Sequence, residues 1–165
     1  VHAAYQSAAT AASTPSPASV SSYSDMGIQI APEMVEGLSI GYAVGEYDET
    51  ASKAIDIETM WVKYAIGGFT VGYQESERDG SAAADSDESE SWAVSYAVSE
   101  DFSVSYGNHE YTEGTNTGTQ DSTGFSASYT AGGIAIKAAF NSTDNIQTTT
   151  TSDEDSYEIA ISFAF

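Results

Sequence analysis

Cysteine is absent from the 165 residues of this chain, and basic residues are scarce. Without cysteine there is neither a disulfide framework nor a thiolate metal site. Lys and Arg number 4 against 25 Asp and Glu, which gives a formal net charge of -21. Because phosphate binding needs clustered Lys and Arg, this acidity argues strongly against a nucleic-acid partner.

Long apolar runs are also missing. No stretch approaches the roughly 18 apolar residues that identify a membrane-spanning helix. If the chain crosses a membrane, it must therefore do so as a closed β-barrel, the other structure that satisfies every backbone group in lipid. The amino terminus has neither an initiator Met nor a charged-then-apolar signal segment. We expect that processing or truncation produced this start.

Motifs that carry catalysis are not found. The sequence contains no nucleophile elbow, phosphate-binding loop or zinc-protease helix motif. His2 and His109 are single and distant in sequence, so they lack the paired spacing of a metal site. Acid-base catalysis by two carboxylates needs environments that separate their pKa values, which exposed, mutually repelling acids lack. We expect that the protein is not an enzyme.

Alternation of apolar and polar residues at a period of two dominates what is present, and it is typical of β-strands. The pattern predicts a single all-β domain over residues 1–165, and residues 1–5 could form part of a tenth strand. The nine strands that we expect cover 21–31, 38–47, 56–66, 69–75, 91–98, 102–110, 123–131, 134–141 and 156–165.

The connections between these strands alternate in length. Short turns are expected at 32–37, 67–68, 99–101 and 132–133, and longer polar loops at 6–20, 48–55, 76–90, 111–122 and 142–155. An up-and-down antiparallel barrel places the two kinds on opposite rims, whereas the Greek-key connections of a sandwich mix them. The alternation of short turns and long loops therefore favours the barrel.

The segment 6–20 is of low complexity, rich in Ala, Ser and Thr. Such a composition cannot bury a core, so we expect a surface loop. A flexible linker between domains is the alternative.

The two faces of the expected strands differ in character. Four strands carry the outward pattern aromatic-x-aliphatic-x-aromatic, as in Phe69-Thr70-Val71-Gly72-Tyr73, which is typical of the aromatic girdles of membrane barrels. The opposite face carries mainly Gly, Ala, Ser and Thr. These side chains are too small to fill an eight-stranded barrel, so they predict a wider, water-filled lumen. A soluble sandwich with a solvated Ser- and Thr-rich face is a less favoured alternative.

A few larger side chains fall on the inward face by the same alternation. We expect Lys63 and Lys137 to line an aqueous path and to bias ion passage by their charge. Alternatively, each lysine pairs with an inward or loop carboxylate. The pore-lining residues that we predict are Trp61, Lys63, Gln74, Lys137 and Glu158.

The densest cluster of charge runs from Glu75 to Glu90. Carboxylate oxygens are preferred ligands of Ca²⁺ and Mg²⁺, so a loosely bound divalent cation at these acidic loops is the one cofactor that we consider. The spacing lacks the Gly and the bidentate Glu of an EF-hand loop, and solvation is the other role open to these acids. The weak metal candidates are Asp85, Asp87, Glu88 and Glu90.

The last nine residues form the clearest strand pattern in the chain. The apolar face of this segment resembles the C-terminal strand of Gram-negative outer-membrane barrels, in which the terminal aromatic residue is part of the signal read by the barrel-assembly machinery. This resemblance implies that the assembly machinery is a partner. The assembly-signal residues are Tyr157, Ile159, Ile161, Phe163 and Phe165.

With the repeats that begin at Phe69 and Phe102 and the rhythm of turns and loops, residues 21–165 resemble the C-terminal half of a general bacterial porin of the sixteen-stranded trimeric kind. The resemblance implies a homotrimer in the outer membrane, in contact with its lipid and lipopolysaccharide. It implies a water-filled channel for passive diffusion of ions and small hydrophilic solutes.

It also implies that the N-terminal part is missing here, including the inward-folded constriction loop after strand five, so that selectivity cannot be read from this chain. The alternatives are a small non-channel barrel that acts as adhesin or anchor, and a soluble acidic surface-layer β-protein.

Overall fold

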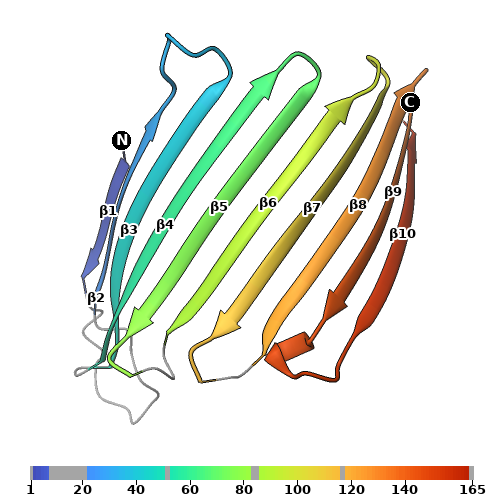
Figure 1. Ribbon diagram of the computed structural model, residues 1–165. Helices are drawn as coiled ribbons and strands as arrows, with labels where there is room; N and C mark the ends of the chain where they lie inside the picture. The colour runs from blue at the N-terminus through green and yellow to red at the C-terminus, as the bar shows by residue number, and fades with distance from the viewer. Residues whose placement is uncertain (1, 8–21, 51–52, 83–85, 116–117, 164–165) are drawn as a thin grey trace.

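The computed structural model describes residues 2–7, 22–50, 53–82, 86–115 and 118–163. These residues form ten β-strands and one short 3₁₀ helix (Figure 1). The elements are β1 His2–Ser7, β2 Ser22–Ile30, β3 Leu38–Thr50, β4 Lys53–Ile66, β5 Phe69–Gly80, β6 Asp87–Ala97, β7 Phe102–Glu113, β8 Thr119–Ala131, β9 Ile134–Asp144, η2 Ile146–Thr148 and β10 Glu154–Phe163.

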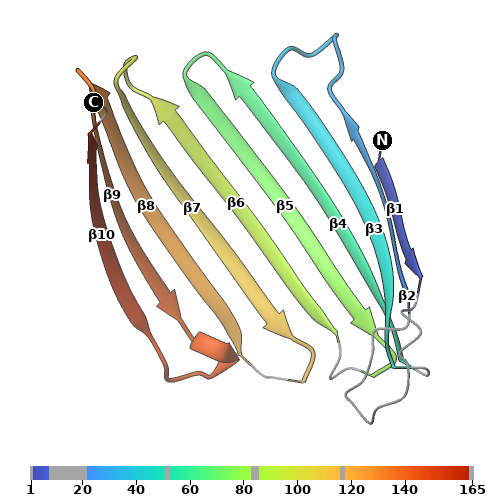
Figure 2. The ribbon, with the colours of Figure 1, turned by 180° about the vertical axis from the view of Figure 1, so that it is seen from behind.

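The ten strands form one antiparallel sheet in the order β1 to β10, so that each strand pairs with its neighbours along the chain. Figures 1 and 2 show a single curved layer with β1 and β10 at its two ends. Within the described residues these two strands do not pair with each other, and the sheet is not closed. The all-β, up-and-down antiparallel architecture is confirmed. Of the residues that the structure describes, none forms a helix with the length and hydrophobicity to span a bilayer.

All nine expected strands are present, and residues 2–7 form the tenth. The strand ends that we expected on the rim of the long loops were wrong. On that rim the strands continue into segments that we expected to be loops. β5 continues to Gly80 and β6 begins at Asp87, so much of the expected loop 76–90 is a hairpin. The expected loops 48–55, 111–122 and 142–155 are shortened in the same way.

The physical reason is that the ladder of backbone hydrogen bonds does not need apolar side chains. Hydrophobic alternation therefore marks only the apolar part of each strand. Residues 6 and 7 belong to β1, and the rest of the expected low-complexity loop 6–20 lies outside the described residues.

Tight turns join the strands on the opposite rim. Gly132 and Gly133 connect β8 to β9 with φ values of 59° and 80°. A type I′ turn requires positive φ at both central residues, and glycine adopts this conformation without steric cost. These two glycines thus fix the register of the β8–β9 hairpin.

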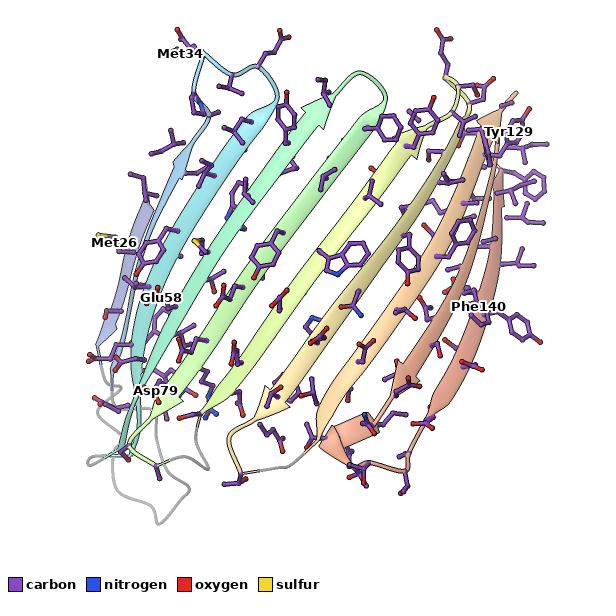
Figure 3. The ribbon with its side chains drawn as sticks, viewed as in Figure 1. Met26, Met34, Glu58, Asp79, Tyr129 and Phe140 are labelled. Atoms are coloured by element: carbon purple, nitrogen blue, oxygen red, sulfur yellow. The ribbon has the colours of Figure 1, made fainter. Side chains whose placement is uncertain are left out.

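Strand register assigns every side chain to one of two faces. Val62 lies opposite Ile40 and Tyr73, while its neighbour Lys63 lies opposite Ser39 and Gly72. We call the face of Val62 the outer face and the face of Lys63 the inner face. The outer face carries Met26, Tyr129 and Phe140, which are labelled in Figure 3.

The sheet has almost no hydrophobic core. Ile55, which is 0% exposed, is the one buried hydrophobic side chain among the described residues. Many large apolar side chains of the outer face are exposed instead, and Tyr157 is 83% exposed. Such a continuous exposed apolar surface is rare on soluble monomers and marks contact with lipid or protein.

Candidate functional site

The inner face holds all five residues that the sequence predicts to line a pore. Trp61, Lys63 and Gln74 line a hollow of about 750 Å³ that extends from β4 to β9. Lys137 and Glu158 line a second hollow of about 350 Å³ near β10. The structure thus divides the five residues between two places on one face, and their role in a pore stays a prediction.

Side chains that can form hydrogen bonds follow one line across the larger hollow. Trp61 on β4 lies opposite Gln74 on β5, Gln74 opposite Ser91 on β6, and Ser91 opposite His109 on β7. The Ser91 Oγ and His109 Nδ1 atoms are 2.7 Å apart and form a hydrogen bond. The sequence does not reveal this line, because it depends on the register between strands rather than on the pattern within one strand.

The indole ring of Trp61 lies over the backbone of Gly41 on β3. A Cβ atom at position 41 would overlap three atoms of the indole ring, and Gly41 is buried. Only glycine therefore allows the ring to approach the strand so closely. Part of the ring remains exposed and lines the hollow.

The basic residues of the inner face differ in their partners. Lys63 and Lys137 are exposed and make no ion pair with a described residue. Arg78 on β5 is part of a network in which its Nη1 donates to Asp87 Oδ2 at 2.9 Å and its Nε donates to the Tyr47 hydroxyl at 3.1 Å. The described residues therefore give no support to the alternative in which the two lysines are neutralised by carboxylates.

The Arg78 network joins β3, β5 and β6 near the rim of the long connections. Sequence reasoning placed Arg78 and Asp87 in a loop and missed their pairing. Glu75, Glu77 and Asp79 continue the phase of Val71 and Tyr73, which could have shown that the strand continues to Arg78, but not which residue Arg78 pairs with.

Acidic side chains occupy the outer face beside the apolar band. Glu77 lies directly opposite Glu58 on β4 and Glu88 on β6. Glu110 on β7 likewise lies opposite Glu90 and Asp121. We call this surface the acidic belt, and Glu58 and Asp79 mark it in Figure 3. Its members are Glu46, Asp48, Asp56, Glu58, Glu75, Glu77, Asp79, Glu88, Glu90, Glu110, Asp121, Asp144 and Asp155.

The weak metal candidates are not brought together. Asp87 lies on the inner face with Arg78, whereas Glu88 and Glu90 lie on the outer face. Asp85 lies outside the described residues. Among the residues that the structure describes, no three His, Asp or Glu side chains are close enough to hold a metal ion.

The terminal strand β10 presents its predicted assembly residues on the outer face. Tyr157, Ile159, Ile161 and Phe163 are all exposed, and each lies opposite a residue of β9. Phe165 lies outside the described residues. An apolar strand at the edge of a sheet presents unpaired backbone groups as well as its side chains.

The sequence matches a family model described as Gram-negative porin over residues 37–165. This match covers β3 to β10 and therefore most of the described sheet. No curated protein matches the chain.

Proposed function

Since the chain belongs to the Gram-negative porin family, we propose that it forms part of a water-filled channel for passive diffusion of ions and small hydrophilic solutes. Porins are transport proteins of the outer membrane that cross it as β-barrels. Family membership favours this channel over the two alternatives from the sequence, a small non-channel barrel and a soluble surface-layer protein.

The main support for the proposal is the distribution of side chains, which is the reverse of that in a soluble protein. The large apolar residues lie on the outer face and are exposed, whereas the inner face carries small and polar residues. Burying the outer face in lipid removes this apolar surface from water, at roughly 25 cal/mol for each Å². The small inner side chains leave room for water in the lumen.

The ten described strands, in this arrangement, do not close into a channel. β1 and β10 lie at opposite ends of the layer, and each has an unpaired edge within the described residues. A lipid-exposed sheet edge is not tolerated in a membrane. We propose that further strands of the same protein complete a barrel of sixteen, assembled as a trimer among outer-membrane lipid and lipopolysaccharide, and that β10 contacts the barrel-assembly machinery.

Thiol labelling on adjacent residues of β7 tests the orientation of the two faces. Because the chain has no cysteine, a single substitution supplies one thiol. Ser105 lies on the inner face and Val104 on the outer face. We expect a charged, membrane-impermeant thiol reagent to label Ser105→Cys in the reconstituted protein and to reduce its conductance. Val104→Cys should instead react with a lipid-soluble reagent.

Labelling of Val104→Cys by the charged reagent, with Ser105→Cys protected, would reverse the faces and contradict the proposal. Absence of any conductance in planar bilayers, from protein that is correctly folded, would contradict the channel itself.

A further inference from the structure

The larger hollow of the inner face combines an aromatic platform with uncharged polar groups. The partly exposed ring of Trp61 lies over Gly41 at one end of it, and Asn141 on β9 lines the other end. Gln74, Ser91 and His109 lie between them in the lining. Binding sites for small molecules typically have this composition, with an aromatic surface and a few polar groups that fix orientation.

The charge of the hollow restricts what it can bind. No carboxylate is among the described residues that line it, and Lys63 is the single Lys or Arg there. A cationic solute finds no counter-ion, and a multiply charged anion finds only one. A neutral solute with many hydroxyl groups can instead exchange hydrogen bonds with Gln74, Ser91, His109 and Asn141.

We propose that this hollow is a binding site for neutral carbohydrate, in particular a short oligosaccharide. The apolar C–H face of one pyranose ring stacks on Trp61, and the hydroxyl groups of the following rings bond to the polar line that begins at Gln74. This inference rests on the proposed channel function and names a class of solute for it.

The dimensions favour an oligosaccharide over a single sugar. Trp61 and His109 lie three strands apart, and neighbouring strands are spaced by about 4.8 Å, so the line is about 14 Å long. Binding must also be weak, because conduction requires that a solute leaves the site as readily as it enters.

Sugar-induced block of ion current provides the test. The complete protein is reconstituted in planar bilayers, and maltotriose, glucose and citrate are added separately. We expect maltotriose to reduce the current with a Kd in the millimolar range, and glucose to do so more weakly. Trp61→Ala should weaken maltotriose block about tenfold, equivalent to about 1.4 kcal/mol, and Trp61→Phe should retain most of it because a ring remains.

Trp92 offers a matched control: it borders the hollow, but its side chain lies on the outer face of β6, where its ring packs against that of Tyr106. Trp92→Ala should leave maltotriose block unchanged. Equal loss of block in the two alanine variants would overturn the assignment to Trp61. Stronger block by citrate than by maltotriose, lost in Lys63→Ala, would assign the hollow to anions and overturn the carbohydrate proposal.

The two proposals fail separately. Channels that conduct ions but are not blocked by maltotriose overturn the carbohydrate site and leave the channel in place. If no channel forms, the carbohydrate site is tested by titration calorimetry of maltotriose with the detergent-solubilised protein. A heat of binding that is lost in Trp61→Ala supports the site, and the absence of any heat of binding overturns it.

Discussion

Removing one carboxylate from the middle of the acidic belt should stabilise the barrel. Glu77 lies directly opposite Glu58 and Glu88 on the two neighbouring strands. Like charges directly opposite each other on a sheet are destabilising by about 0.2–1 kcal/mol for each pair. Glu77→Gln relieves both pairs, so we expect the free energy of unfolding to rise by about 0.4–2 kcal/mol at low ionic strength.

The measurement is urea unfolding of the detergent-solubilised complete protein, followed by circular dichroism in buffer without divalent cations. Glu158→Gln is the matched control, because Glu158 lies on the inner face and its one cross-strand partner among the described residues is Ala139. It should change the unfolding midpoint little. In 1 M salt the Debye length falls to about 3 Å, so the gain of Glu77→Gln should largely disappear.

Divalent cations should act on the same repulsion. Mg²⁺ loosely associated with the belt would offset its charge, so we expect added Mg²⁺ to stabilise the wild-type protein more than Glu77→Gln. If Glu77→Gln and Glu158→Gln gave equal midpoints, or if the gain persisted in 1 M salt, cross-strand repulsion in the acidic belt would be refuted.

Three further predictions concern conduction, assembly and the rim of the long connections. Changing both Lys63 and Lys137 to Glu should shift the reversal potential in a salt gradient toward cation selectivity, and more so at low salt, since neither lysine on the inner face forms an ion pair with a described residue. Unchanged selectivity at every salt concentration would withdraw their pore-lining role. Phe163→Ser should lower the yield of protein in the outer membrane far more than Ser162→Ala, because Phe163 lies on the apolar outer face and Ser162 does not. Equal yields of the two variants in fractionated membranes would contradict the assembly signal. Arg78→Gln should lower the free energy of unfolding by about 1–3 kcal/mol, since it removes charged hydrogen bonds to β3 and β6. An unchanged midpoint of urea unfolding would show that the Arg78 network does not stabilise the protein.

The faces of the strands could be predicted from the sequence because the side-chain period of a strand is two. Once Val62 is assigned to the apolar face, its neighbours Trp61 and Lys63 must both lie on the opposite face, independently of how the other strands pair. The hydrophobic pattern likewise located nine of the ten described strands, since each of these carries an apolar segment of its own, and it left residues 1–5 as a possible part of the tenth. Register and alternation thus gave the same inner face.

Strand ends and cross-strand partners could not be obtained in this way. The hydrophobic pattern stops at Tyr73, but the backbone ladder continues through Glu75, Glu77 and Asp79, whose side chains keep the same phase. The pairing of Arg78 with Asp87 depends on the register of β5 against β6. A pattern within either strand contains no information on that register.

The net charge of the chain is a poor guide to the charge of the lumen. The acidic belt lies on the outer face, where its field acts on the membrane surface, and it accounts for much of the formal charge of -21. The described side chains on the inner face of the strands include five carboxylates and three basic groups, an excess of only two negative charges. The described strands thus contribute only a weakly acidic wall, and ion selectivity follows the charges that line the path rather than the total. The inner carboxylates are Asp25, Asp87, Glu113, Glu154 and Glu158, and the basic groups are Lys63, Arg78 and Lys137.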